Sequence, residues 1–588
     1  MINILVVDGE IHLKSEYNTD IVKFMRTRKK RFWNTAEREW VIPESEMENL
    51  IEVISDFDYT ITNQDNSNHD KNKQQQIENI IPNWYNFKTQ PFPHQVEGIC
   101  YGLTHDKFLL ADEQGLGKTA QVINLACILK EERKINHVLI IACVNGLKYN
   151  WFEEVSKHSN ESAYILGTRY RKNGNVYIGS NEDRLDDLRS LGTGADIDKH
   201  FFIITNIETL RFSRTEQVPL KTKKNGIQRY KKVHKFPIVE QIQKLTKDGT
   251  IGMIAVDELH RACNSASIQG KALLSIRADN MVAMTGTPIM NNPIDSYLPL
   301  AWLGYEKISL HGFKKHYCIM GGFGAHQIVG YRNLEDIQAM LDKCMLRRLK
   351  KDVLNLPEKI YINDYVEMTK EQAKLYDEVK NDITEHIDQI ELSPNPLTLL
   401  IRLRQVTGNP NILSSTIKGN PKFERMMEII EDVVSNGGKA LVFSNWLDVL
   451  IPAYELAKSK NYNPALYTGQ NAKTREQEKQ MFKTDPSCKV LFGIISAMGV
   501  GLTLTEANTV IFLDEPWNRA TKDQCEDRVH RIGTTDSPNV ITLMCRNTID
   551  ERINDIVYRK GKLSDILIDK EEDIINNKKL LNYLLSTN

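Results

Sequence analysis

The sequence predicts an α/β fold with two parallel-sheet lobes, and three observations support this prediction. Short apolar runs alternate with helical patterns from residue 84 to 300, and the same alternation returns from 426 to 550. Strands buried on both faces of a parallel sheet are expected to be continuous apolar runs rather than alternating ones. The length of 588 residues also exceeds what one hydrophobic core can fill and corresponds to roughly four structural units.

The chain begins with a stretch, 1–61, that we expect to form a small α+β module. Its pattern predicts a strand, a helix, a second strand and a second helix, in that order, at 2–7, 19–27, 38–42 and 45–54. Residues 62–83 should link this module to the first lobe, because 62–76 are polar and lack apolar periodicity. A long surface loop is the alternative interpretation of that polar stretch.

Each lobe is assigned from five apolar runs. The first lobe (84–300) should have strands at 108–111, 138–143, 201–205, 251–256 and 281–284. The second lobe (426–550) should have strands at 440–443, 464–467, 490–494, 509–513 and 540–544. Between them we expect helical insertions and an inter-lobe linker at 301–425, and after them a C-terminal helical brace at 551–588.

The composition excludes several classes of protein. With 76 Lys and Arg against 77 Asp and Glu, the net charge of -1 excludes a histone-like protein but leaves room for a local basic groove. No apolar run approaches the roughly 20 residues that a membrane-spanning helix needs. The residues MINILVVDGE lack a basic start followed by a long apolar stretch, so we do not expect secretion. Nine cysteines without a CxxC pair favour a reducing, cytoplasmic location and argue against structural zinc.

The run DEQGLGKTAQ after the first predicted strand indicates a phosphate-binding loop. Gly115 and Gly117 allow the backbone N–H groups to approach phosphate, and Lys118 would reach the β and γ phosphates. The Thr119 hydroxyl would bind Mg²⁺. Asp112 departs from the pattern GxxxxGK[ST], which has glycine at that position. A chance GKT in a loop is the alternative, and the motifs further along the chain argue against it.

An acidic pair follows the predicted strand at 251–256. Two buried carboxyl groups are costly unless they hold a metal ion or a proton. Asp257 therefore suits the Mg²⁺ shell, and Glu258 suits the group that orients and deprotonates water. His260 either couples this site to the next motif or makes an ordinary structural hydrogen bond.

The motifs that follow resemble those of Snf-type DNA translocases, which belong to helicase superfamily 2. MTGTP at 284–288, LRRLKKDV at 346–353 and LPEK at 356–359 match in order. LVFSNW, GVGLTLTEA, EPWN and QCEDRVHRIG continue the match in the second lobe. The box that usually reads DEAH is DELH here. The resemblance spans 87–551 and implies two RecA-like lobes that use ATP and Mg²⁺.

The resemblance also implies roles for individual residues. Gln95 would recognise adenine, unless it is a plain surface helix residue, and Asp112 and Gln524 would help to bind the nucleotide. Thr285 and Thr287 would couple the site to movement. Residues lining the DNA path would be Asn145, Thr205, Gly499, Gly501, Thr505 and Trp517. The segment 145–151, together with Glu154, is also expected to line the DNA path. For Trp517, a place in the core is an equal alternative.

Two arginines of the second lobe suit the γ-phosphate. Arg528 and Arg531 are three residues apart, which places them on one face of a short helix. A guanidinium is permanently charged, and its planar donor fork matches phosphate oxygens. We therefore expect both to act as arginine fingers; the alternative is a surface ion pair with Asp527 or Glu526.

Two further segments are basic. The segment KKRFWNTAEREWVIP at 29–43 resembles the HARP-type module of annealing helicases, with Trp33, Trp40 and Pro43 carrying the similarity. That likeness implies recognition of branched DNA, whereas Trp40 is better explained as part of a small core. The stretch 211–235 is rich in Lys and Arg and forms either a phosphate-binding patch or a solvated insertion.

The leading interpretation is an ATP-dependent translocase that tracks along duplex or branched DNA. It would hydrolyse ATP with Mg²⁺ and use the energy to remodel forks, anneal strands or displace proteins. We expect a monomer without membrane association, and protein partners could bind the N-terminal module. One alternative is a strand-separating DNA or RNA helicase. A second alternative, from another class, is a non-catalytic DNA-binding scaffold, which the complete set of hydrolytic residues disfavours.

Overall fold

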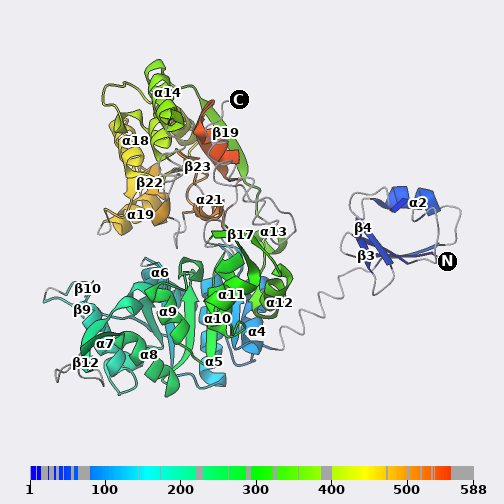
Figure 1. Cartoon of the computed structure of the whole chain (residues 1–588), viewed down its shortest axis with the longest axis vertical. Coiled ribbons are helices and arrows are strands. Elements are labelled where there is room, and N and C mark those ends of the chain that lie inside the picture. The colour runs from blue at the N-terminus through cyan, green and yellow to red at the C-terminus, as the bar shows by residue number, and fades with distance from the viewer. Residues whose placement is uncertain are drawn as a thin grey trace. The chain divides into compact units, whose positions relative to one another are not determined.

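The fold is taken from a computed structural model of the chain. It describes residues 2–7, 10–14, 21, 24–25, 32–34, 39–43, 46–54 and 59–63. It then describes 80–557, except 145, 173, 220–229, 263, 287–292, 322–326, 355, 386–399, 472–473, 499–503, 517–518, 532–533, 535–536 and 556. The chain divides into two compact units, Met1–Tyr85 and Asn86–Asn588 (Figure 1).

The first unit contains a five-stranded sheet of order β3-β4-β2-β1-β5, counted over its described residues. Its elements are β1 (Ile2–Val7), β2 (Glu10–Lys14), β3 (Phe32–Asn34), β4 (Glu39–Pro43), α2 (Met47–Ile54) and β5 (Tyr59–Asn63). Strands 2–7 and 38–42 and helix 45–54 are thus confirmed. The polar linker was expected from residue 62, but Thr62 and Asn63 pair with β1 in parallel, because the β-branched alternation of 59–62 favours a strand.

Trp40 packs against the core of this unit, beside residues such as Ile42 and Leu50. This confirms its interpretation as a core residue. Trp33 lies opposite Trp40 in the ladder between β3 and β4. The basic residues at 29–31, most of the expected helix at 19–27 and the linker at 64–79 lie outside the described residues.

The second unit holds two parallel sheets, which confirms the predicted fold class (Figure 1). In the described part of the chain, the first-lobe sheet has seven strands in the order β18-β6-β15-β14-β7-β11-β8. These strands are β6 (Lys107–Leu110), β7 (His137–Ala142), β8 (Ala163–Ile165), β11 (Phe202–Asn206), β14 (Ile251–Asp257), β15 (Asn280–Met284) and β18 (Met345–Leu346).

Both faces of this sheet are covered by helices because its apolar strands are buried on both sides. Leu139 and Ile141 of β7 pack into one core, whereas Val138 and Ile140 pack into the other. One face is covered by α4 (Pro93–Thr104), α5 (Lys118–Glu132) and α6 (Leu147–His158). The other is covered by α7 (Asn181–Ser190), α8 (Pro237–Lys247), α9 (Ile268–Ser275), α10 (Tyr297–Leu303), α11 (Leu310–Tyr317) and α12 (Leu334–Cys344).

The second-lobe sheet has six described strands in the order β19-β24-β23-β20-β22-β21. They are β19 (Ile360–Val366), β20 (Ala440–Ser444), β21 (Ala465–Tyr467), β22 (Val490–Ile494), β23 (Thr509–Phe512) and β24 (Asn539–Cys545). Helices α17 (Pro421–Ser435) and α18 (Leu447–Ser459) cover one face. Helices α19 (Arg475–Thr484), α20 (Ile495–Met498) and α21 (Arg519–Glu526) cover the other.

The stretch 301–425 is helical only in part. It contains α13 (Lys350–Val353), α14 (Lys370–Glu385) and α16 (Leu400–Gly408), but also the hairpin of β16 (Cys318–Gly321) and β17 (Gln327–Tyr331). Strand β18 extends the first-lobe sheet, and β19 extends the second-lobe sheet. Residues of the stretch are therefore built into both lobes. Helices therefore occur in this stretch as expected, but its strands were not predicted, since β18 is too short to give a pattern and β19 is exposed along most of its length.

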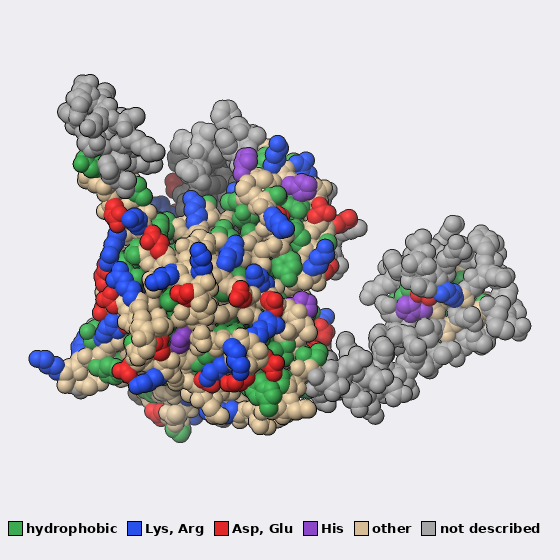
Figure 2. Space-filling model, turned by 90° about the horizontal axis from the view of Figure 1, so that it is seen from below, with side chains coloured by type: hydrophobic (Ala, Val, Ile, Leu, Met, Phe, Trp, Pro, Cys, Tyr) green, Lys and Arg blue, Asp and Glu red, His purple; other side chains and the backbone are tan. Residues whose placement is uncertain are grey.

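Charges of both signs are interspersed over the face shown in Figure 2, as the net charge of -1 suggests. No helix within the described stretches has both the length and the apolar content that crossing a bilayer requires.

Candidate active site

The phosphate loop connects the carboxyl end of β6 to the first turn of α5. Gly115 and Gly117 have φ of 94° and 76°, a left-handed backbone that only glycine adopts without strain. A Cβ at Gly117 would lie 2.2 Å from Gln95 Nε2, so the loop also needs glycine for close packing. Lys118 is the first residue of α5, and its Nζ donates to the Asp112 carbonyl at 2.7 Å. The sequence therefore builds a compact cradle of N–H groups at a helix N-terminus.

Gln95 lies against this loop from α4. Its Nε2 donates to the Leu116 carbonyl at 3.2 Å, and its Oε1 accepts the Phe92 N–H at 3.0 Å. His94 Nε2 lies 3.0 Å from the same Leu116 carbonyl. The glutamine expected to recognise adenine therefore sits beside the loop, where it also holds the loop in place.

The departure at Asp112 has a structural explanation. Arg348, which follows β18, binds this carboxylate with two bonds, Nε to Oδ1 at 3.0 Å and Nη2 to Oδ2 at 2.6 Å. Gln121 Nε2 donates to Oδ2 at 3.0 Å. Asp112 is fully buried, and its side chain is an internal ion-pair partner; its role in binding the nucleotide stays a prediction. The pattern GxxxxGK[ST] gave no sign of Arg348, which lies 236 residues away in sequence.

Replacing Asp112 with glycine restores the usual pattern but should destabilise the protein. The Arg348 guanidinium would be left buried without its carboxylate, which typically costs about 3–5 kcal/mol. We expect a clearly lower urea midpoint for the first-lobe transition. Glu97→Ala is the matched control, because it removes the exposed partner of the same arginine and should cost about 0–1 kcal/mol. An unchanged midpoint for Asp112→Gly would show that the buried pair contributes nothing.

The acidic pair ends β14 in the middle of the sheet. Asp257 is buried, and its Oδ2 accepts the indole N–H of Trp151 at 2.9 Å. Burial, followed by the charge of Glu258, raises the pKa of Asp257 to about 7. Trp151 was expected along the DNA path, but it is fully buried and orients Asp257 instead.

Glu258 has φ of 54°, a conformation that costs a non-glycine residue about 1–3 kcal/mol and is concentrated at functional sites. Its Oε1 accepts Gln114 Nε2 from the phosphate loop at 3.2 Å. Its Oε2 lies 3.2 Å from His260 Nδ1 but outside hydrogen-bond geometry, so this buried oxygen has no hydrogen-bond partner among the described residues. The backbone thus holds a carboxylate oxygen ready for a further partner.

His260 links the acidic pair to the next strand. Its Nδ1 lies 2.9 Å from the Thr285 hydroxyl oxygen at the end of β15. Burial lowers the pKa of His260, so the ring is neutral near pH 7. A Cβ at Gly286 would lie 3.4 Å from the Gln114 backbone nitrogen, so this motif also packs on the phosphate loop. His260 is thus in direct contact with Thr285 of the motif that follows, a contact that fits either of its two predicted roles.

The two arginines lie on a turn after α21, not on a helix. The helix ends at Glu526, and the N–H groups of Arg528 and Val529 then bond only three residues back, to the Cys525 and Glu526 carbonyls, both at 3.1 Å. Arg528 Nε donates to the Gln524 carbonyl at 2.8 Å, and Arg531 Nε donates to the Asp527 carbonyl at 2.9 Å. These bonds fix the orientation of both guanidinium planes.

Arg531 packs on the phosphate loop of the other lobe. A Cβ at Gly115 would lie 3.5 Å from Arg531 Cγ and 3.1 Å from Lys350 Cε. Burial, followed by the charge of Arg528, lowers the pKa of Arg531 to about 9. The negative charge of Glu258 works in the opposite direction and raises the pKa of both Arg528 and Arg531. The phosphate loop, the acid and the arginines therefore form one site, and two crowded cations favour an anion there.

The segment after β18 fixes this turn to the first lobe. Lys350 N–H donates to Glu113 of the loop at 2.8 Å, while its Nζ reaches Asp527 Oδ1 at 2.8 Å. Lys359 Nζ lies 3.0 Å from Glu526 and 2.9 Å from Asp527. The suggested surface ion pair of the arginines with these carboxylates was wrong, because both carboxylates are buried and bind lysines.

Some of the remaining predicted residues lie in the described part of the structure, and the others lie outside it. Thr205 is buried, and its hydroxyl donates to Thr209 Oγ1 at 3.2 Å; its place on the DNA path stays a prediction. Thr505 follows Leu504, whose N–H donates to the Arg528 carbonyl. The carbonyl of Gln524 accepts a hydrogen bond from Arg528 Nε. Thr119 is half-buried in the first turn of α5. Asn145, Thr287, Gly499, Gly501 and Trp517 lie outside the described residues.

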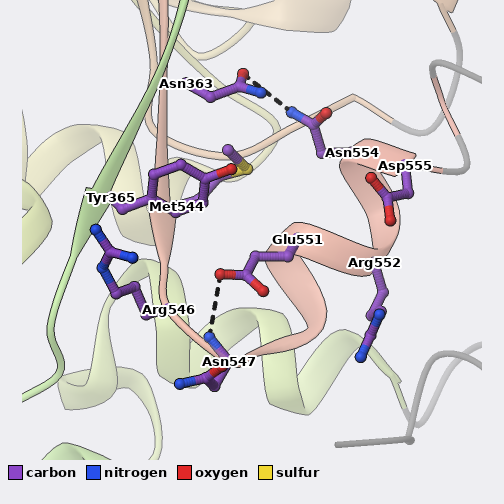
Figure 3. A pocket seen from close by; sticks show the side chains of 9 residues that line it. All are labelled: Asn363, Tyr365, Met544, Arg546, Asn547, Glu551, Arg552, Asn554 and Asp555. Carbon is purple, nitrogen blue, oxygen red and sulfur yellow. Dashed lines mark hydrogen bonds between the residues drawn. The ribbon is translucent and has the colours of Figure 1, made fainter. Parts of the chain in front are cut away.

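A separate cavity of about 440 Å³ lies in the second lobe between β19, β24 and the helix after β24 (Figure 3). Asn554 Nδ2 donates to Asn363 Oδ1 at 3.4 Å, and Asn547 N–H donates to Glu551 Oε1 at 3.2 Å. Its lining consists of Asn363, Tyr365, Met544, Arg546, Asn547, Glu551, Arg552, Asn554 and Asp555. It contains none of the residues predicted for ATP or DNA.

A family model described as the SNF2-related domain matches residues 17–412. The chain belongs to the SNF2-related family. A second family model, the helicase conserved C-terminal domain, matches residues 421–533, which cover most of the second-lobe sheet and the arginine turn. The SNF2-related assignment agrees with the motifs of both lobes.

Curated relatives of this SNF2-related chain include two bacterial proteins. An uncharacterized ATP-dependent helicase of Mycoplasma pneumoniae is 27% identical, over 80% of this chain and 41% of that protein. A putative ATP-dependent helicase/translocase of Bacillus subtilis is 24% identical, over 79% of this chain and 46% of that protein. The chain thus spans less than half the length of these relatives. The Sulfolobus solfataricus SWI2/SNF2 ATPase core in complex with dsDNA matches 86% of this chain and 99% of that chain, with 24% identity and a TM-score of 0.36.

Proposed function

We propose that this SNF2-related chain hydrolyses ATP between its two lobes and uses the energy to track along duplex or branched DNA. The observation that carries the proposal is the packing of Arg531 from the second lobe against Gly115 of the phosphate loop. A hydrolytic site divided between two lobes links the chemistry to their relative movement.

The site residues fit ATP and a divalent cation. The glycine cradle and Lys118 suit the phosphates, and Thr119 and Asp257 would hold Mg²⁺, which neutralises phosphate charge when bound. The unbonded oxygen of Glu258 suits the orientation and deprotonation of the attacking water. The two arginines suit the charge that spreads over the γ-phosphate oxygens in the transition state.

Coupling to movement follows from the division of the site. ATP touches both lobes only when they are closed, so it favours the closed state, and hydrolysis removes that preference. If DNA backbone contacts both lobes, each cycle shifts one lobe along the strand. Phosphate contacts carry little sequence information, so the movement should tolerate any sequence.

DNA as the track is supported by the family and by the relatives named as helicases. We expect the rate of ATP hydrolysis to rise several-fold with duplex or forked DNA, measured by phosphate release at saturating ATP. RNA alone should not stimulate it; stimulation by RNA would redirect the proposal to the RNA-helicase alternative. No hydrolysis with any nucleic acid would favour the non-catalytic scaffold.

A comparison of triplex displacement with duplex unwinding on matched substrates separates tracking from strand separation. A translocase displaces a triplex-forming third strand without unwinding matched duplex, whereas a strand-separating helicase also unwinds the duplex.

Removal of residues 1–76 tests the HARP-like proposal: hydrolysis without DNA should persist while preference for forked DNA weakens. An unchanged preference after this truncation would contradict a branched-DNA role for the first unit.

A further inference from the structure

Two β-hairpins extend from one edge of the first lobe, and neither takes part in the ATP site. One pairs β9 (Thr168–Tyr170) with β10 (Val176–Ile178), and the other pairs β12 (Arg214–Pro219) with β13 (Tyr230–Lys235). Both leave the sheet near α7, at the same end of the lobe (Figure 1). The stretch 211–235, which the sequence left open as patch or solvated insertion, is thus a hairpin in its described part.

Both hairpins are fixed to adjacent sides of α7. Arg169 of β9 binds Asp183 at 3.2 Å and Asp187 at 2.9 Å. Arg214 of β12 binds Glu182, with Nε 3.3 Å from Oε1. Residues 183 and 187 share one side of the helix, and 182 is rotated by about 100° from 183 and about 140° from 187. The two hairpins therefore stand at a fixed spacing on one support.

The hairpins carry aromatic side chains that are largely exposed to solvent. Tyr170 is 74% exposed, Tyr230 is 57% exposed and Tyr177 is 42% exposed. Arg171 lies over the Tyr177 ring at 5.4 Å. Rings left in water on an anchored support are available to stack on a ligand, and exposed apolar patches rimmed by polar residues often mark binding sites.

The charge of this surface is positive. The segment 168–178 has three cations and no acidic residue. The carboxylates of α7 nearest the hairpins are already paired with Arg169 and Arg214. Arg171, Lys172 and Lys232 are exposed and make no ion pair among the described residues. Positive charge beside exposed rings matches a nucleic acid strand, whose phosphates bind cations and whose unpaired bases stack on aromatic rings.

The helix that supports both hairpins contacts a segment that the sequence predicts to line the DNA path. Arg184 of α7 donates to Thr209 Oγ1 at 2.8 Å, within the segment η3 (Ile207–Arg211) that leads into β12. Bases paired within a duplex offer only their edges to side chains in the grooves, whereas single-stranded bases can stack. We propose that Tyr170, Arg171, Lys172, Tyr177, Tyr230 and Lys232, the two-hairpin surface, bind a single-stranded DNA arm that adjoins the duplex held by the motor.

This inference rests on the proposed DNA translocase function and adds a second DNA contact to it. The test uses the full chain and two fluorescent probes, a blunt duplex and the same duplex with a single-stranded thymidine arm. An aromatic variant carries Tyr170→Ser, Tyr177→Ser and Tyr230→Ser. A charge variant carries Arg171→Gln, Lys172→Gln and Lys232→Gln. The control variant carries Ile319→Ser and Met320→Ser, which are exposed apolar residues elsewhere on the first lobe.

The aromatic variant should lose about tenfold or more in affinity for the armed duplex, while affinity for the blunt duplex stays within about twofold. The charge variant should lower the salt dependence on the armed duplex, with the slope of log affinity against log salt reduced by about 2. Hydrolysis without DNA should match the wild type in both variants, which also shows that they are folded. The control variant should resemble the wild type on both probes.

The failures can be told apart. If the wild type binds neither probe, the DNA function itself fails. If the wild type binds both probes but the aromatic variant loses neither, or loses both equally, the two-hairpin surface does not hold a single strand.

Discussion

Arg531→Ala should reduce the turnover of ATP by roughly 10³- to 10⁵-fold, the range over which arginine fingers act in GTPases. The Arg531 side chain lies against Gly115, where its guanidinium can meet charge that develops on the γ-phosphate. Because that charge is largest in the transition state, kcat should fall far more than KM for ATP rises. Steady-state hydrolysis with saturating DNA measures both.

Two controls sharpen this result. Arg425→Ala removes an arginine of the same lobe whose Nε binds Asp364 at 2.8 Å away from the site, and it should hydrolyse ATP normally. Arg531→Lys should fail to restore turnover, because an ammonium lacks the planar donor fork. An Arg531→Ala variant that keeps kcat within about threefold of the wild type would rule out a direct role in the transition state. Arg528 is a poorer test, since it is fully buried and its loss should also destabilise the turn.

Much of this site could be predicted from the sequence because its parts follow buried strands. The phosphate loop, the acidic pair and Thr285 come directly after β6, β14 and β15, which are neighbours in the sheet. The carboxyl ends of neighbouring parallel strands meet at one edge, so an apolar run followed by polar residues locates the site. All ten strands predicted for the two lobes occur, with ends within a residue or two.

The parts that escaped prediction depend on contacts between distant segments. Nothing local to Asp112 reveals that Arg348 neutralises it, and nothing local to Asp257 reveals its bond to Trp151. Strand β18 is only two residues long, so it leaves no periodic pattern. The spacing of Arg528 and Arg531 suggested a helical face, but the helix ends at Glu526 and the turn is held by bonds to Lys350 and Lys359. The one available signal was Asp112 itself, an acid at the position where the phosphate-loop pattern has glycine.

Glu258→Gln should abolish turnover almost as fully as Arg531→Ala, with a loss of about 10²- to 10⁴-fold in kcat. Glutamine keeps the shape of the side chain and can still accept the bond from Gln114, which holds Oε1 at 3.2 Å. It lacks the charge with which the second, unbonded oxygen would take a proton from water. Binding of a fluorescent ATP analogue should therefore remain within about threefold of the wild type, whereas Lys118→Ala should weaken it. A Glu258→Gln variant with ordinary turnover would assign the proton transfer to another group.

Combining Glu258→Gln with Arg531→Ala tests whether the two lobes act on one chemical step. Residues that work as a unit are strongly non-additive, because the first loss already removes the step that the second would have assisted. We expect the double variant to hydrolyse ATP about as slowly as the slower single variant. Losses that multiply would mean that the acid and the arginine act independently. Arg531 reaches Gly115 of the phosphate loop only when the second lobe lies against the first. Glu258 and Arg531 should therefore act on the same step, in the closed state of the two lobes.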